Sequence, residues 1–323
     1  MKEKKKKFKH LKSVTAVLIC FCVLLTTFTG CGSAPKINKE NGKTIVTIGY
    51  LPITHGLAVF EAKELLDQQQ DGTIEVRLQK FSTWNDLMDA LNSGRIDGAS
   101  VLIELAMGAA SLGIELKAAA LGHKDGNVVV VSNDITSAKD LKGKTFAIPS
   151  KQSSHNILLN DMLKENGMSI EDIEVIQLAP AEMASSLASG SIDGYCVAEP
   201  FGAQSVVKGY GHILYDSKEL WEDSICCALV FNGKFLEKQK ETADILIEKY
   251  MEAGNALRDK EVAMDVAEKY LGQEREVLES SLEWIHYDNL EITKENYDVL
   301  AEKVKEYGIN ENPPSYEEFV YQP

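Results

Sequence analysis

Short apolar runs alternate with amphipathic stretches from residue 44 onward. The runs are rich in β-branched residues and predict strands, which in the first part of the chain lie at 45–50, 73–81, 99–102 and 116–121. Apolar residues at helical spacing predict the intervening helices, at 57–69, 84–93 and 105–112. This alternation predicts a mostly parallel sheet with helices on both faces.

The same alternation starts again at 128–131, where four consecutive valines predict a strand buried on both faces. Strands are then predicted at 144–148, 173–178, 195–198 and 211–215, separated by helices at 154–166, 182–188 and 200–208. A further apolar strand is expected at 228–231. The periodicity beyond it predicts a C-terminal tail packed across the back of the preceding structure, with helices at 234–256, 260–271, 274–285 and 294–307.

One eight-residue segment occurs twice. Residues 91–98 read Leu-Asn-Ser-Gly-Arg-Ile-Asp-Gly, and residues 187–194 read Leu-Ala-Ser-Gly-Ser-Ile-Asp-Gly, with six of the eight positions identical. In both copies the glycine after Ser suits a left-handed helix end, the isoleucine starts the next strand, and Asp-Gly bends the chain into the sheet. We therefore predict an α/β protein with two similar lobes, at 44–127 and 128–225. The first lobe is completed by part of 226–323, which holds the return strand and the helical tail.

Two passages of the chain between the lobes predict a two-strand hinge, and a hinge between α/β lobes makes a cleft. Ligands of open α/β sheets bind beyond the carboxyl ends of the strands. The polar side chains that follow such strand ends and begin helices are Thr54, His55, Ser153, Ser154 and His155. A helix N-terminus favours an anion or a carbonyl oxygen, so these residues are candidate ligand contacts. Thr54, Ser153 and Ser154 could instead only cap helices, whereas a histidine in the equivalent loop of both lobes favours function.

Three further candidates follow strand ends. Trp84 and Phe201 could form walls of the cleft or belong to the core. Glu199 precedes a proline and could cap a helix or hold the hinge. If it faces the cleft, it suits a ligand that carries a hydrogen-bond donor, or a bound cation, rather than a bare anion.

The charge distribution excludes one class of partner. The chain carries a formal charge of −15, but residues 1–30 hold seven lysines and one glutamate, so they contribute +6 and the remainder carries −21. An acidic body argues against nucleic acid, because phosphate binding needs a basic surface.

The N-terminus has the pattern of a targeting segment. A lysine-rich stretch at 2–12 precedes an apolar stretch at 14–25, and residues 28–31 (Phe-Thr-Gly-Cys) resemble a bacterial lipobox. This predicts a signal peptide at 1–30, lipid on Cys31, a tether at 31–43 and an extracytoplasmic, membrane-anchored protein. A transmembrane helix is the alternative, but the apolar stretch is short for a span.

The remaining cysteines, Cys196, Cys226 and Cys227, are odd in number, so a disulfide framework is not expected. Cys226 and Cys227 are adjacent, which would place them on opposite faces of a strand as buried thiols. We predict no metal site, because the ligands are too few and too widely spaced, and no cofactor. We also predict no enzyme activity, since no G-x-S-x-G or phosphate-loop pattern is present.

Several motifs together resemble the nitrate/sulfonate/taurine/bicarbonate class, the substrate-binding lipoproteins of ABC importers. The motifs are 49–55 (Gly-Tyr-Leu-Pro-Ile-Thr-His), 81–84 (Phe-Ser-Thr-Trp), the repeated Gly-x-Ile-Asp-Gly, 153–156 (Ser-Ser-His-Asn) and 199–202 (Glu-Pro-Phe-Gly). The resemblance implies a type II periplasmic-binding fold and a monomer that delivers a small solute to a membrane permease and its ATPase. It implies ligand contacts at Pro52, Thr54, His55, Trp84, His155 and Glu199.

The resemblance leaves the solute open. Nitrate and bicarbonate binders usually have Trp after Glu-Pro, and Phe201 in its place argues against nitrate. Sulfonates, thiamine pyrimidine precursors and riboflavin also bind to this fold. An enzyme similar to the thiamine-pyrimidine synthases and a receptor that feeds a sensor are the alternatives. The predicted export and the lack of a Cys-rich metal segment argue against the enzyme.

Overall fold

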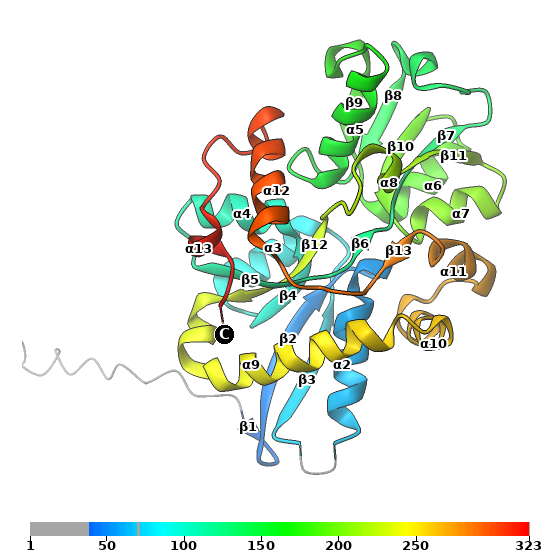
Figure 1. Ribbon diagram of the computed structural model, residues 1–323. Coiled ribbons are helices and arrows are strands. Elements are labelled where there is room, and N and C mark those ends of the chain that lie inside the picture. Colours follow the sequence, from blue (N-terminus) through cyan, green and yellow to red (C-terminus); the bar gives the residue numbers. More distant parts are fainter. Residues whose placement is uncertain (1–38, 70–71, 323) are drawn as a thin grey trace, which may run out of the picture. The chain divides into compact units, whose positions relative to one another are not determined.

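The computed structural model describes residues 39–69 and 72–322 of the protein. Two β-sheets with connecting helices form its framework (Figure 1). Residues 39–323 form one compact unit. The predicted signal peptide and Cys31 lie outside the described residues. Within the described ranges, no helix has both the length and the apolar character that crossing a membrane requires.

The first sheet contains the strands near the N-terminus and one strand that returns late in the chain. Its order is β1-β2-β4-β12-β5, and β3 pairs with β2. The strands are β1 (Lys39–Glu40), β2 (Lys43–Tyr50), β3 (Ile74–Lys80), β4 (Gly98–Leu102), β5 (Leu116–Leu121) and β12 (Cys227–Asn232). The connecting helices are η1 (Thr54–Gly56), α2 (Leu57–Asp67), α3 (Trp84–Ser93) and α4 (Ile103–Ser111). Strand β2 runs parallel to β3 and β4, whereas β12 is antiparallel to both β4 and β5.

The second sheet has the order β11-β7-β10-β8-β9. Its strands are β7 (Asn127–Ser132), β8 (Thr145–Ile148), β9 (Glu174–Gln177), β10 (Gly194–Ala198) and β11 (Gly211–Asp216). Its helices are η2 (Ala138–Leu141), α5 (Ser154–Glu165), η3 (Ile170–Asp172), α6 (Pro180–Ala188), α7 (Phe201–Val207) and α8 (Ser217–Leu220). Strand β10 is parallel to β8 and antiparallel to β7, so each sheet contains one crossing strand that runs against its neighbours.

The predicted α/β class with two mostly parallel sheets is confirmed, and the crossing strands β7 and β12 mark the places where the chain passes from one sheet to the other. A short antiparallel ribbon of β6 (Lys124–Asp125) and β13 (Ile285–His286) lies beside the first crossing (Figure 1). The ribbon explains why the predicted helix at 274–285 ends early, since its last residue pairs with β6.

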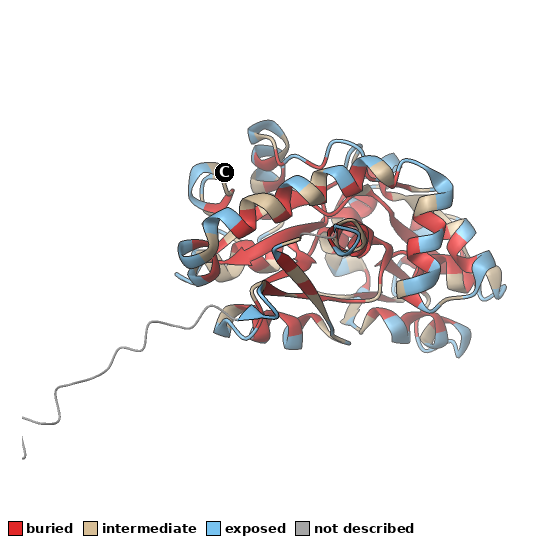
Figure 2. Ribbon diagram, turned by 90° about the horizontal axis from the view of Figure 1, so that it is seen from below, coloured by how far each residue is buried: buried red, intermediate tan, exposed pale blue. Residues whose placement is uncertain are grey.

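The C-terminal part is helical, as predicted. Its helices are α9 (Gly233–Ala256), α10 (Lys260–Leu271), α11 (Arg275–Ser281), α12 (Lys294–Glu306) and α13 (Tyr316–Phe319). Helix α9 packs on α2 of the first sheet, and α11 packs on α7 of the second. Figure 2 shows these helices buried on their inner faces and exposed on their outer faces, which is the arrangement that amphipathic periodicity predicts.

The repeated octet makes the same contacts in both sheets. The Thr47 amide donates to Asp97 Oδ2 at 2.8 Å, and the Thr145 amide donates to Asp193 Oδ2 at 2.9 Å. Gly94 and Gly190 both have φ of +72°, as the predicted helix ends require. The strands begin at the final glycine of each octet rather than at the isoleucine. Each aspartate therefore bonds to the neighbouring strand and holds the incoming chain against it, in addition to bending the chain.

Candidate functional site

The candidate residues meet where strands of both sheets end and where the chain crosses between the sheets. The 3-10 helix η1 follows β2, Trp84 begins α3 beyond β3, and Glu104 lies in the first turn of α4 directly after β4. From the second sheet, Ser154 and His155 begin α5 beyond β8, and Glu199 follows β10. His123 lies on the first crossing, and Cys226 and Cys227 lie where the second crossing enters β12.

The two sheets touch through backbone groups at this point. Both the amide and the hydroxyl of Thr54 donate to the Glu199 carbonyl, at 2.9 Å and 3.0 Å. The Glu199 amide in turn donates to the Gly126 carbonyl at 3.1 Å. The hydroxyl of Thr54 therefore links the first sheet to the loop after β10.

His55 is oriented by its neighbours. Its Nε2 lies 3.1 Å from the Gly126 carbonyl oxygen, so this nitrogen carries the proton and Nδ1 is left with a lone pair. The ring stacks on that of His123, with the centroids 3.5 Å apart. His55 Nδ1 has no hydrogen-bond partner among the described residues.

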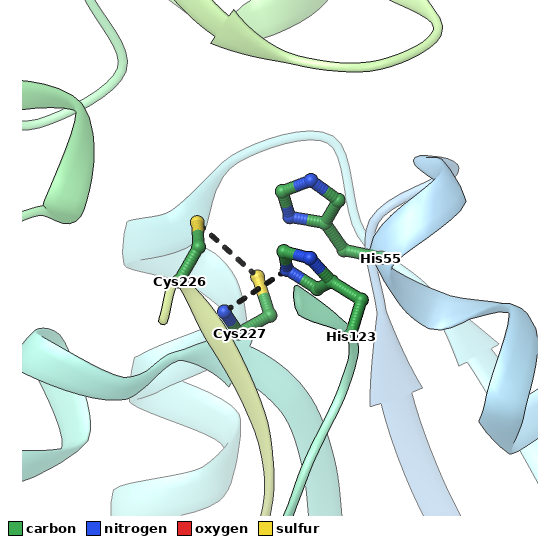
Figure 3. Close-up of side chains that lie close together, drawn as sticks. All are labelled: His55, His123, Cys226 and Cys227. Carbon is green, nitrogen blue, oxygen red and sulfur yellow. Dashed lines mark hydrogen bonds between the residues drawn. The ribbon is translucent and has the colours of Figure 1, made fainter. Parts of the chain in front are cut away.

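Cys226 and Cys227 do not lie on opposite faces of a strand, contrary to the expectation from their adjacency. Strand β12 begins at Cys227, so Cys226 precedes the strand and its side chain does not follow the strand's alternation. The two Sγ atoms are 3.9 Å apart. One potential ligand atom from each of His55, His123, Cys226 and Cys227 lies within 4.8 Å of all the others, and we call these four side chains the His–Cys cluster (Figure 3).

Burial governs the ionisation of these groups. It lowers the pKa values of His123 and His155 to about 4, and it raises the pKa of the Glu104 carboxyl well above the usual value. Burial also opposes ionisation of Cys226, but hydrogen bonding to Cys227 and the nearby imidazoles of His155 and His55 hold its pKa well below that of a free thiol. The imidazoles of His123 and His155 are therefore neutral at pH 7, the form in which histidine binds metals.

Many buried polar atoms of residues that follow strand ends have no hydrogen-bond partner within the described part of the chain. They include both ring nitrogens of His155, both carboxyl oxygens of Glu104, Ser154 Oγ and Trp84 Nε1. All four residues are at most 5 % exposed. Folded proteins pair more than nine in ten of their buried polar groups. A concentration of unpaired groups at the strand ends of two sheets is therefore unusual for the interior of a folded protein.

The other predicted residues are placed as follows. Ser153 donates to the Ser150 carbonyl at 2.6 Å, so its hydroxyl stabilises its own loop. Glu199 Oε2 accepts from the Ala203 amide at 2.8 Å and caps α7, while burial raises the pKa of this carboxyl to about 7. Phe201 packs in the main core, and Pro52 is half-buried. Of the predicted set, His55, Trp84, Ser154, His155 and Glu199 offer an unpaired buried atom among the described residues.

Sequence reasoning missed the contribution of four residues. These are Glu104 and His123, together with Cys226 and Cys227, which the sequence predicts only as buried thiols. They are separated from His55 by 49 to 172 positions, so no local spacing connects them. The sequence signal that could have identified them is their position at predicted strand ends and at the passages between the lobes.

The fold is that of the periplasmic solute-binding proteins. The nitrate-binding protein NrtA from Synechocystis aligns with a TM-score of 0.75 over 85% of this chain and 84% of its own, at 20% sequence identity, which shows the fold alone. The sequence profile of the NMT1-like family matches residues 39–271, and the chain belongs to this family.

A ligand-binding component of an ABC-type import system from Staphylococcus aureus, solved with zinc bound, is 37% identical over 86% of this chain and 96% of its own, with a TM-score of 0.83. The nitrate/nitrite-binding protein NrtA of Synechocystis is 26% identical over 68% of this chain and 55% of its own length. The chain spans between 34% and 55% of the length of the first curated relatives it matches. The predicted resemblance to nitrate- and sulfonate-binding proteins is confirmed.

Proposed function

We propose that the protein is the extracytoplasmic solute-binding component of an ABC importer. It encloses a small solute between the two sheets and delivers it to a membrane permease driven by an ATPase. The observation that carries this proposal is the group of buried, unpaired polar atoms contributed by both sheets at their strand ends. The family supports it, because relatives such as NrtA are binding proteins rather than enzymes.

The relatives do not agree on one solute. They are described as binding nitrate or nitrite, as binding aliphatic sulfonates, or as an ATP-binding protein of bicarbonate transport, and the Staphylococcus aureus protein holds zinc. In this chain the site contains two buried carboxyl groups, Glu104 and Glu199, together with buried thiols and imidazoles. An anion would face these carboxyl groups without a buried lysine or arginine beside them in the described residues. The chemistry therefore favours a cation or a solute rich in hydrogen-bond donors.

The rest of the proposal concerns the lobes, the membrane anchor and the ligand contacts. We propose lobes at 44–127 and 128–225, a signal peptide at 1–30, and a lipid on Cys31 that anchors a monomer through the tether at 31–43. Ligand contacts are proposed at Pro52, Thr54, His55, Trp84, Ser153, Ser154, His155, Glu199 and Phe201. The hydroxyls of Thr54 and Ser153 already donate to carbonyl groups, so these two residues would contribute mainly backbone groups and shape.

Entry of a solute requires the sheets to separate, because the site residues at the centre have no exposed surface. Asp161 on α5 of the second sheet joins helix α12 through Lys303, with Nζ 2.8 Å from Oδ2, and through the Tyr307 hydroxyl, 2.5 Å from Oδ1. Because α12 belongs to the C-terminal tail, these bonds hold the second sheet against the rest of the protein. They are candidate contacts that form on closure and break on opening.

Replacing Asp161 with alanine should weaken solute binding about 3- to 10-fold, because the closed form loses roughly 1 kcal/mol of ion-pair and hydrogen-bond free energy. The measurement is the Kd by calorimetry together with the radius of gyration by X-ray scattering, which should increase without solute. Lys164→Ala is the matched control: it removes the Lys164–Glu306 pair between the same two helices, but that pair is largely exposed and contributes little. Equal effects of the two variants would contradict a closing role for Asp161.

A thermal-shift screen of the full chain tests the proposed function. The panel holds nitrate, bicarbonate, taurine, alkanesulfonates, hydroxymethylpyrimidine, riboflavin and Zn²⁺, each with and without a chelator. A true solute at a hundred times its Kd stabilises the protein by about 2.7 kcal/mol. We expect at least one solute to stabilise the wild type and to lose most of its effect on Trp84→Phe, while Trp221→Phe serves as the control. Absence of any shift across the panel would count against a solute receptor.

A further inference from the structure

The His–Cys cluster has the donor set of a metal site. It combines two imidazoles and two thiols, all buried, with one ligand atom from each within 4.8 Å of the other three (Figure 3). Thiolate and imidazole are the ligands that zinc and other borderline or soft ions prefer, whereas calcium and magnesium prefer oxygen.

The distances agree with tetrahedral zinc. With Zn–S bonds of about 2.3 Å, two sulfur ligands of a tetrahedral ion lie about 3.8 Å apart. The observed separation between Cys226 Sγ and Cys227 Sγ is 3.9 Å. A disulfide would need the sulfur atoms about 2.05 Å apart, so the pair has the spacing of two metal ligands rather than of a bond.

The histidines are also prepared for coordination. Metal-binding histidines usually donate their second ring N–H to a carbonyl or carboxylate, which fixes the tautomer. His55 does so through Nε2 to Gly126 and presents Nδ1, which has no partner in the ranges described. His123 Nε2 accepts from the Cys227 amide at 3.4 Å, a long contact that a metal bond would replace.

The position of the His–Cys cluster between the two sheets suits a metal ion that is taken up and released. His55 belongs to the first sheet, and the other three residues lie on the two crossings. His155 begins α5 of the second sheet, and neither of its ring nitrogens has a partner among the described residues. Separation of the sheets would therefore uncover the cluster, and closure would bring a fifth potential ligand to it.

We propose that the solute of this receptor is a thiophilic divalent metal ion, with Zn²⁺ as the representative, held by His55, His123, Cys226 and Cys227 and covered by His155. This inference rests on the proposed function and names the substrate class of the same site. Two thiolates balance the charge of one divalent ion, so the closed site is neutral around its cargo. Glu104 is a further buried carboxyl group, in the first turn of α4.

The test uses the full chain, reduced and stripped of metal, with Zn²⁺ and Co²⁺ as probes. Zn²⁺ affinity is measured by competition with a chromophoric chelator, and Co²⁺ reports its ligands through its absorption spectrum. We expect one ion per chain, tetrahedral d–d bands and intense thiolate-to-cobalt charge transfer. Loss of an outer hydrogen bond to a ligand weakens metal affinity by about 10- to 100-fold, so loss of a ligand in Cys226→Ser or Cys227→Ser should weaken it by more than about 100-fold.

Cys196→Ser is the matched control, because Cys196 is equally buried but lies in β10, outside the cluster. It should bind Zn²⁺ like the wild type and keep the charge-transfer band. Should the two cysteine variants fail to fold, the Co²⁺ spectrum of the wild type and the His123→Asn variant still decide the question. Binding unchanged by Cys226→Ser, a cobalt spectrum without thiolate bands, or a Cys226–Cys227 disulfide that persists under reductant would overturn the proposal.

Different results would contradict the receptor function and the metal assignment. If a metal-free solute stabilises the protein in the presence of chelator and Trp84→Phe abolishes that effect, the receptor function stands and the metal assignment falls. If neither a metal ion nor any other solute of the panel stabilises the protein, both fall.

Discussion

Replacing His155 with leucine is expected to weaken solute capture by about 10- to 100-fold, because the variant removes a polar contact worth roughly 1.5–3 kcal/mol to a charged or strongly polar solute. The same change should raise the free energy of unfolding measured without solute. His155 is fully buried and neither of its ring nitrogens has a hydrogen-bond partner in the described residues. A buried unpaired polar group costs about 1–3 kcal/mol, and leucine fills a similar volume without that penalty.

Opposite changes in binding and stability distinguish a ligand contact from a structural histidine, whose loss lowers stability. The measurements are urea denaturation of the full chain without solute and the Kd of the solute that the panel identifies. His212→Leu is the control, since His212 is a half-buried residue of β11 on the outer part of the second sheet. A His155→Leu variant that is less stable than the wild type and binds equally well would show that the ring serves packing alone.

Replacing Phe146 with alanine is expected to lower the free energy of unfolding by about 3–5 kcal/mol, the range for loss of a fully buried phenylalanine. Phe146 is central to the core of the second sheet and has no exposed surface. Its ring lies over Gly194, the last residue of the second octet, where an added Cβ would come within 3.0 Å of the ring. In the first octet a ring also lies over the last glycine, but it is that of Phe231, which comes from the antiparallel strand β12 rather than from a parallel strand.

The glycine allows a specific control. Alanine at 194 alone should destabilise the protein, because its methyl group meets both the Phe146 ring and Val131 Cγ1. In the double variant Gly194→Ala/Phe146→Ala the methyl group occupies part of the cavity, so the loss should be smaller than the sum of the two single losses. Urea denaturation of the four proteins measures the coupling. Strict additivity would mean that the ring and the glycine do not share this packing.

The sequence predicted the framework well because its signals are local. Strand and helix positions follow from apolar periodicity, and the positive φ at Gly94 and Gly190 follows from the requirement of a helix end for a residue without Cβ. The histidines at 55 and 155 could be assigned to equivalent loops because the octet had already defined two similar lobes.

Adjacency in the sequence was misleading at Cys226 and Cys227. The prediction of opposite faces assumed that both residues belong to a strand, but the strand begins between them and turns both thiols toward His55 and His123. The boundary of a strand depends on where its partners β4 and β5 end, which is a tertiary property. The prediction that ligands are too few and too widely spaced for a metal considered spacing along the chain, whereas the fold brings four donors from three separate parts of the chain within 4.8 Å of one another.

Hydroxyl groups show a second limit of prediction from the sequence. Thr54, Ser153 and Ser154 have the same local pattern, a hydroxyl at the start of a helix, yet the structure gives them different partners. Thr54 bonds to Glu199 of the other sheet and Ser153 to its own loop, whereas Ser154 has no partner among the residues described. Only the arrangement of the two sheets decides which hydroxyl is left for a solute.

The sequence by itself determined the two-lobed α/β fold, its strand-end loops and the family, because periodicity, glycine positions and motifs act within a few residues of one another. The tertiary structure decided the chemistry of the site. It brought together His55, His123 and the cysteine pair, and it buried Glu104 and His155 without partners in the described chain. These are distance and burial properties of residues far apart in sequence, and they exist only once both crossings between the sheets are formed.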